Sequence, residues 1–233
     1  MVRARSFLAD FLIWPAVVAG DAFFLLVYIG LGFLIVQRFG AGHQVLVVVG
    51  AAYGLGYLIA ALLGAAIGIR TGFRRTATVA SGCWILVPLL MSLSASMAAL
   101  AACAGLLGAA GGAMWPNIEA ELARGRQGPS LRRRLSVFNV TWSLGTLAGP
   151  LLSGWLYPPE SVVYSAAGRD AINRVFFVSA GLAVAMAVLL AAWRPHIPSV
   201  EGSCGVEEEP PHDPGLLRAF LRMSYVANLL CYV

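Results

Sequence analysis

Apolar stretches long enough to cross a membrane recur along the chain, and only short polar segments separate them. A helix needs about 20 apolar residues to cross the ~30 Å hydrocarbon core of a bilayer. The pattern predicts six such spans, at residues 14–37, 44–69, 77–95, 97–116, 135–157 and 174–193. The expected fold class is therefore an all-α integral membrane protein built around a six-helix bundle.

The third and fourth spans need a separate argument, because residues 76–118 contain no charged side chain. A single helix over that run would be about twice as long as a membrane can hold. The chain must turn within it, and the small polar cluster Ser92–Ser96, after Pro88, is the expected place. Unpaired backbone groups are not tolerated in lipid, so this turn should lie at the membrane interface.

Composition excludes a soluble globular domain. Hydrophobic residues make up 59% of the chain and charged residues 12%, against roughly a quarter charged in ordinary soluble domains. The sequence shows no cluster of His, Cys and carboxylate residues with metal-ligand spacing, no nucleophile elbow and no phosphate-cradling glycine loop. It therefore predicts neither an enzyme nor a bound metal or cofactor, and the expected surroundings are the lipid bilayer.

Basic residues indicate the membrane topology. All 16 are arginine, and positive residues near the spans are retained on the cytoplasmic side. With the N-terminus inside, 13 arginines fall on inner segments, and only Arg38, Arg169 and Arg174 fall outside. We therefore expect a multi-pass protein with a cytoplasmic N-terminus. The block Arg132–Arg134 lacks interleaved aromatic residues, which favours a headgroup anchor over a nucleic-acid partner.

Arginine as the sole basic residue type, together with abundant alanine and glycine, suggests a GC-rich bacterial genome. The expected location is then the cell inner membrane.

Residues 64–75, GAAIGIRTGFRR, form a glycine-rich apolar helix end that leads into a tight turn with three arginines. This stretch resembles the cytoplasmic loop between helices 2 and 3 of the major facilitator superfamily of transporters, whose pattern is GxxxDRxGRR. The leading glycine of the pattern is Ala65 here, and the acidic residue that ends helix 2 is Ile69. The remaining aligned positions are Arg70, Gly72, Phe73 and Arg74, and Arg75 follows.

After Trp193 the chain becomes polar, proline-rich and acidic, which favours a flexible connection exposed to water. The expected domains are a six-helix bundle over residues 1–193, a cytoplasmic linker over 194–215 and the start of a truncated seventh helix over 216–233. This order is similar to the N-terminal half of a major facilitator protein with the C-terminal half missing, and the resemblance covers the whole chain.

The resemblance implies membrane transport of a small solute by alternating access, with the chain inactive without its other half. The expected partners are a small-molecule substrate of unknown class and a separately encoded C-terminal half. Two alternatives stay open: a non-functional fragment, and a small membrane protein with a structural or interaction role. The sequence identifies no substrate, transport direction or coupling ion.

Small residues recur in the predicted spans 97–116 and 135–157. Such spacing lets helix backbones approach closely in lipid, where packing replaces the hydrophobic effect as the attractive term. The segment GTLAGPLLSGW is also similar to the family's antiporter-associated motif, although Ser153 and Val137 replace two of its glycines. Packing is the favoured interpretation. The matching positions are Gly145, Gly149, Pro150 and Gly154.

Polar groups inside the spans are the candidates for a substrate or ion pathway, because membrane burial is tolerated only beside a cavity or a partner. Asp21 is the acidic residue that lies well inside a predicted span. It either binds a proton or a cationic substrate, or pairs with a loop arginine. The other candidates either line a pathway or serve helix packing and interhelical hydrogen bonds; they are Tyr28, Tyr53, Tyr57, Asn139 and Trp142.

Two carboxylates beyond Pro116 are the expected partners of the arginine-rich turn. Glu119 and Glu121 should emerge at the same membrane face as that turn, and the family pairs these regions. We therefore expect at least one contact between these carboxylates and Arg70, Arg74 or Arg75.

Overall fold

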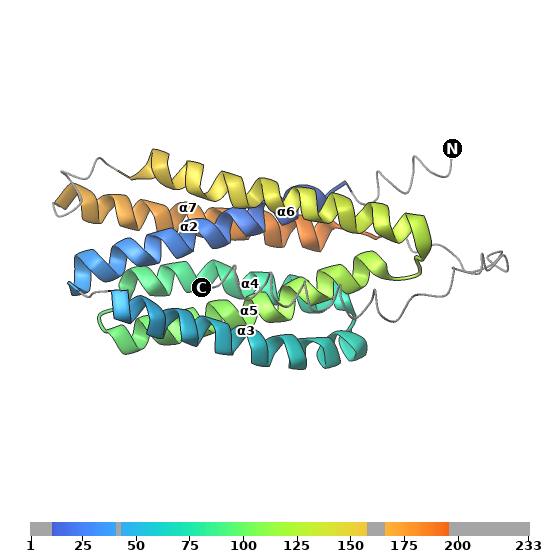
Figure 1. Ribbon diagram of the computed structural model, residues 1–233, viewed down its shortest axis with the longest axis horizontal. Coiled ribbons are helices and arrows are strands. Elements are labelled where there is room, and N and C mark those ends of the chain that lie inside the picture. The colour runs from blue at the N-terminus through green and yellow to red at the C-terminus, as the bar shows by residue number, and fades with distance from the viewer. Residues whose placement is uncertain (1–10, 41–42, 158–165, 196–233) are drawn as a thin grey trace, which may run out of the picture. The chain divides into compact units, whose positions relative to one another are not determined.

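The computed structural model describes residues 11–40, 43–157 and 166–195, all within one compact unit, Met1–Ile197. Within these ranges it contains six helices, each with a segment long and apolar enough to cross a membrane (Figure 1). They are α2 (Ile13–Phe39), α3 (His43–Thr71), α4 (Phe73–Leu93), α5 (Met97–Ala123), α6 (Gly128–Leu156) and α7 (Ala166–Ala192).

The predicted all-α fold with six spans is confirmed, but several helices are longer than predicted. Helix α5 runs past residue 116 to Ala123, and α6 begins at Gly128 rather than near 135. The prediction ended the fourth span at Pro116, which lies inside α5, and began the fifth after Arg134. A helix continues through the headgroup region, where arginine is readily solvated. The block Arg132–Arg134 therefore lies within α6. The predicted seventh helix, 216–233, and nearly all of the linker lie outside the described residues.

The predicted turn between the third and fourth spans is present. Helix α4 ends at Leu93, and α5 begins at Met97. The Ser96 hydroxyl caps α5 by accepting a hydrogen bond from the Ala99 backbone N–H at 3.2 Å, which satisfies one of the donors that a helix start leaves open. The Ser94 hydroxyl donates to the Leu90 carbonyl at 2.8 Å. The serines thus supply the polar contacts that end one helix and start the next.

A single residue, Gly72, connects α3 to α4. Its φ is +98°, a conformation that side-chain-bearing residues adopt only at a cost and that glycine adopts freely. The glycine in the arginine-rich turn is therefore required by the sharpness of the reversal.

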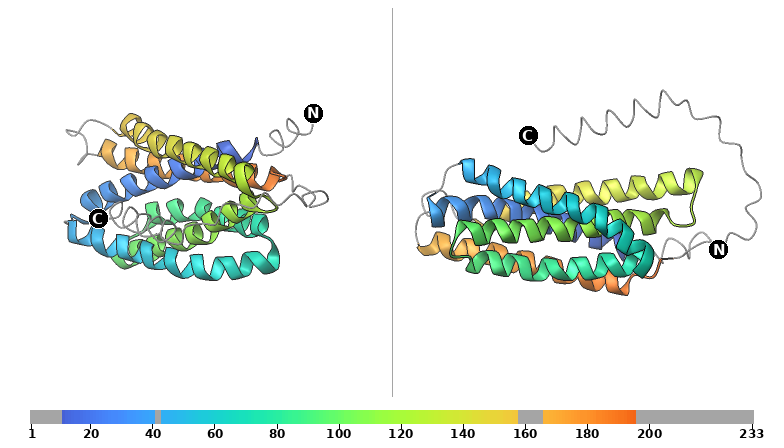
Figure 2. Two further views of the ribbon diagram at one scale, coloured as in Figure 1. Left: turned by 45° about the vertical axis from the view of Figure 1, so that its right-hand side comes forward. Right: turned by 90° about the horizontal axis from the view of Figure 1, so that it is seen from below.

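The six helices form three layers of two. Seen from below in Figure 2, α3 and α6 lie on one side, α4 and α7 on the other, and α2 and α5 between them. Helix α2 packs against α6 and α7, α5 packs against α3 and α4, and α4 packs against α7. Exchanging the first three helices with the last three leaves this pattern unchanged. The bundle is therefore built from two related three-helix repeats.

The interior between these layers is filled by large side chains, with Trp84 of α4 at its centre. Trp84 is fully buried, and its ring stacks on Phe23 of α2 with centroids 4.6 Å apart. Its ring N–H donates to the Leu107 carbonyl of α5 at 3.0 Å. One side chain thus joins three helices and leaves no buried indole donor unpaired.

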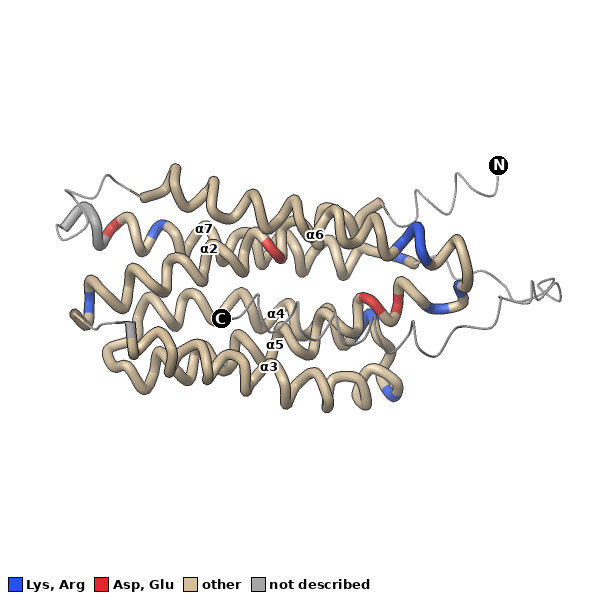
Figure 3. The backbone as a smooth tube through the Cα atoms, in the orientation of Figure 1, with Lys and Arg blue, Asp and Glu red and all other residues tan. Residues whose placement is uncertain are grey.

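Most charged residues lie at the two ends of the bundle (Figure 3), and Asp21 within α2 is an exception. The end at which α3 meets α4 and α5 meets α6 carries most of the described arginines, including Arg70, Arg74 and Arg75. Arg38 and Arg174 belong to the opposite end. The arginine asymmetry read from the sequence therefore corresponds to two ends of a folded bundle.

Candidate functional site

Asp21 lies inside the bundle. It is the ninth residue of α2, about 12 Å from the start of the helix at a rise of 1.5 Å per residue. Only 3% of its surface is exposed. Its carboxylate oxygen Oδ2 accepts a hydrogen bond from the Thr146 hydroxyl of α6 at 2.5 Å, and the side chain of Trp142 interacts with the same carboxylate. The carboxylate therefore joins α2 to α6.

The described partners of Asp21 bear on the two roles expected for it. In the part of the chain that the structure describes, no arginine forms an ion pair with this carboxylate. A side chain that contacts this carboxylate in the described part of the chain carries a neutral hydroxyl. This arrangement leaves the negative charge of the carboxylate uncompensated by a described cation.

Helix α6 presents a polar stripe next to this carboxylate. Asn139, Trp142 and Thr146 follow one another at spacings of three and four residues, which places them on one face of the helix. Trp142 is 46% exposed and Asn139 is also exposed. Thr146 was not among the residues predicted from the sequence, although its position one turn after Trp142 was a usable signal.

The three predicted tyrosines lie near one another. Tyr28 belongs to α2, and Tyr53 and Tyr57 belong to α3. The ring of Phe24 connects them, since it lies 6.1 Å from Tyr28 and 5.3 Å from Tyr53, and Tyr53 lies 6.2 Å from Tyr57. Phe24, missed in the sequence analysis, is three residues after Asp21 and Tyr28 is seven after it, so all three share one face of α2.

Close packing of glycines sets the distance between α2 and α6. A methyl group at Gly145 would lie 2.7 Å from the Asp21 Cβ, and one at Gly149 would lie 2.6 Å from the Leu25 Cβ. Gly154 differs, because a methyl group there would meet nothing within 4 Å. Two glycines of the motif therefore let the helices approach and bring Thr146 to Asp21, while Gly154 and the exposed Pro150 do not take part.

Glycines of α5 have the same role against α3. A methyl group at Gly108 would collide with the backbone carbonyl of Tyr53, and one at Gly112 would collide with that of Tyr57. Backbone contact of this kind fixes the two tyrosines relative to α5. The close contacts at Gly108, Gly112, Gly145 and Gly149 are those that the packing interpretation requires.

The arginine-rich turn makes a different contact from the predicted one. Arg74 donates from Nη1 to the backbone carbonyl of Trp193, just after α7, at 2.6 Å. Among the described residues, Glu121 pairs with Arg124 of its own helix end at 3.6 Å, and no ion pair joins Glu119 or Glu121 to Arg70, Arg74 or Arg75. The nearby end of α7 offers open carbonyls, which compete for arginine with the carboxylates.

No group of three or more His, Cys, Asp or Glu side chains that could hold a metal ion occurs among the described residues. The candidate site is instead a buried carboxylate beside hydroxyl and aromatic groups from α2, α3 and α6. A bundle of six spans built from two three-helix repeats, with an ionisable group inside it, has the features of a polytopic membrane transporter.

Comparison with known families agrees with this class. A family model described as Major Facilitator Superfamily matches residues 6–233. The chain belongs to the major facilitator superfamily, whose members are transporters rather than enzymes, and it is a membrane transporter protein. Comparisons with curated proteins and with solved structures gave no match.

Proposed function

We propose that this chain supplies one six-helix bundle of a transporter that moves a small solute by alternating access, and that Asp21 binds a proton or a cationic group during the cycle. The observation that carries the proposal is the buried Asp21 carboxylate, which is held by the Thr146 hydroxyl and not by a described cation. Ionisable groups are expensive within a membrane and are retained where they serve an ion or substrate pathway.

The exposed polar stripe of α6 indicates that a second bundle covers this face. Asn139 lies about 7.5 Å beyond Arg134 along α6, inside the span, and its side chain is exposed on the bundle. Tyr28 is 54% exposed on the neighbouring helix α2. An amide facing lipid at this depth is unfavourable, so this face is expected to border a water-filled cavity or another protein surface. A second six-helix bundle rocking against this face would provide both.

The site residues then have distinct roles. Asp21 is the ion-binding group, and Thr146 and Trp142 hold its carboxylate. Tyr28, Tyr53, Tyr57 and Asn139 line the pathway with ring faces and polar atoms. By this proposal the bundle does not transport alone, and a C-terminal bundle, encoded separately or otherwise supplied, completes the pathway.

Infrared difference spectroscopy on the purified chain tests the role of Asp21. Changing from alkaline to acidic buffer should produce a protonated-carboxyl band that is lost in Asp21→Asn. Asp170→Asn, which removes an exposed carboxylate near the start of α7, is the matched control and should retain that band. In a second assay, organic cations should raise the thermal stability of the wild type. The proposed ion-binding role is contradicted if Asp21→Asn leaves the spectrum unchanged and organic cations do not stabilise the wild type.

A flux measurement tests the requirement for a second bundle. The full chain is reconstituted in liposomes with an imposed proton gradient and offered sugars, amino acids, drugs and organic anions. The chain alone should give no flux above empty vesicles, and addition of a complementary six-helix bundle should restore transport. Flux by the unaccompanied chain would refute the requirement for a partner while leaving Asp21 open to the spectroscopic test.

We also propose that the arginine-rich end of the bundle faces the cytoplasm of a bacterial cell, which places the protein in the inner membrane. Single cysteines labelled in intact cells by an impermeant thiol reagent test this orientation. A cysteine at Ser130 should stay unreacted and one at Ala167 should react. The reverse labelling pattern would show that the arginine-rich end faces the outside of the cell.

A further inference from the structure

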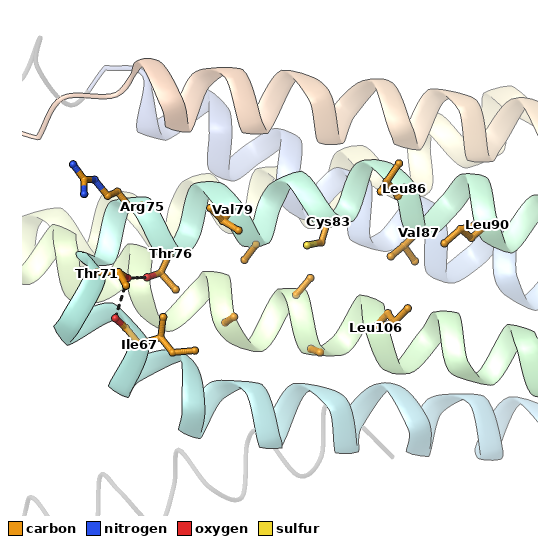
Figure 4. Close-up of a pocket in the computed structure, with 14 residues that line it drawn as sticks. Ile67, Thr71, Arg75, Thr76, Val79, Cys83, Leu86, Val87, Leu90 and Leu106 are labelled. Atoms are coloured by element: carbon orange, nitrogen blue, oxygen red, sulfur yellow. Dashed lines mark hydrogen bonds between the residues drawn. The ribbon is translucent and has the colours of Figure 1, made fainter.

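A groove lies along α4 and α5, and the last part of α3 borders it at one end (Figure 4). It encloses about 660 Å³, and its lining is almost entirely apolar. Helix α5 lines the groove with the small residues Ala109, Ala110 and Ala113, which leave room above the helix. Larger apolar side chains come from α4, which contributes Val79, Leu86 and Leu90, and from Leu106 of α5.

One end of this groove is polar and basic. Arg75, Thr71 and Thr76 lie at the same end, away from Leu90 and Leu106 (Figure 4). The two threonine hydroxyls are 2.9 Å apart, and Thr71 also donates to the Ile67 carbonyl at 2.9 Å. Arg75 is exposed, and no described carboxylate pairs with it or lines the groove. Its charge is therefore available to an anion at the groove mouth.

The groove is long enough to hold an acyl chain of one membrane leaflet. From Thr76 to Leu90, helix α4 rises about 21 Å, which exceeds half of the ~30 Å hydrocarbon core. Arg75 then lies at headgroup depth, where arginine attracts anionic lipids. The apolar part lies at the depth of the acyl chains.

We infer that this groove binds an anionic phospholipid, with one acyl chain against α5 and the phosphate on Arg75. The inference is independent of the transport proposal, because α4 carries none of the residues assigned to the pathway. We favour a lipid over a protein segment because the groove is basic at one end and apolar along the rest. A phospholipid has the same arrangement, with a charged headgroup at one end and apolar acyl chains behind it.

Native mass spectrometry of the full chain in neutral detergent tests the inference. Dioleoylphosphatidylglycerol and dioleoylphosphatidylcholine share their acyl chains and differ in headgroup charge. The wild type should bind one phosphatidylglycerol about fivefold more tightly than phosphatidylcholine, as expected for one basic residue beside an anionic headgroup. Arg75→Gln should remove most of this preference, and Arg75→Lys should keep it.

Two matched controls separate the groove from general attraction to the basic end of the bundle. Arg70→Gln removes an exposed charge at the same end but outside the groove lining, and it should retain the preference. Cys83, exposed within the groove, offers the steric test. Cys83→Phe should reduce binding of both lipids severalfold, whereas Cys83→Ser should not. Circular dichroism of each variant should show unchanged helix content.

Three results would overturn the inference. The first is a wild type that does not distinguish the two lipids, and the second is an equal loss in Arg75→Gln and Arg70→Gln. The third is displacement of the bound lipid by millimolar inorganic phosphate, which would assign the mouth to a free anion and leave the acyl-chain part unsupported.

Discussion

Substitution of Gly149 by alanine tests whether close contact between α2 and α6 holds the bundle and its carboxylate site together. The added methyl group would lie 2.6 Å from the Leu25 Cβ and 3.0 Å from the Ala22 carbonyl oxygen. Carbon atoms prefer separations of about 3.5–4.0 Å, so the two helices must move apart by roughly 1 Å or deform locally. Gly154→Ala, in the same helix, is the matched control, because nothing lies within 4 Å of its added methyl group.

The expected energies follow from two terms. Alanine is about 1 kcal/mol better than glycine inside a helix, and this gain applies to both variants. Overpacking a close contact costs about 1–3 kcal/mol, and this cost applies only at Gly149. The helix term cancels when the variants are compared, so Gly149→Ala should be less stable than Gly154→Ala by ~1–3 kcal/mol. Gly154→Ala itself should equal or exceed the wild type.

Unfolding of the purified chain in mixed micelles of dodecyl maltoside with increasing SDS, followed by circular dichroism, measures this difference. The protonated-carboxyl band of Asp21 provides a second reading, since separation of α2 from α6 should lengthen the Asp21–Thr146 hydrogen bond and shift the band. If Gly149→Ala proves as stable as Gly154→Ala, the helices are not held by glycine contact and the packing interpretation fails.

Two further predictions use the same unfolding assay. Thr146→Val removes the hydroxyl that donates to Asp21 and should lower the free energy of unfolding by ~1–3 kcal/mol, because a buried acceptor loses its donor; Ser143→Ala, whose hydroxyl bonds within α6, should change it less. Arg74→Gln removes the charged hydrogen bond to the end of α7 and should cost ~1.5–3 kcal/mol, whereas the exposed Arg70→Gln should stay within about 0.5 kcal/mol of the wild type.

The hydrophobic pattern by itself determined the class of the protein and its span count. Long apolar runs have one stable arrangement in lipid, since every backbone group must be paired within its own helix. The same local logic located the reversal at Ser92–Ser96 and the tight turn at Gly72, because capping hydroxyls and a positive φ depend only on neighbouring residues. The end of α5 and the start of α6 were misjudged because Pro116 and Arg134 were treated as helix boundaries, whereas both helices continue past them.

Tertiary structure alone decided which residues meet. Asp21 and Thr146 are 125 positions apart in the chain, and no periodicity relates them; the approach of Gly145 and Gly149 to α2 brings them together. The partner of Arg74 likewise depended on where α7 ends. Spacing along one helix assigns residues to a face, but which face meets which neighbour is fixed by the packing of all six helices, and that information is distributed over the whole chain.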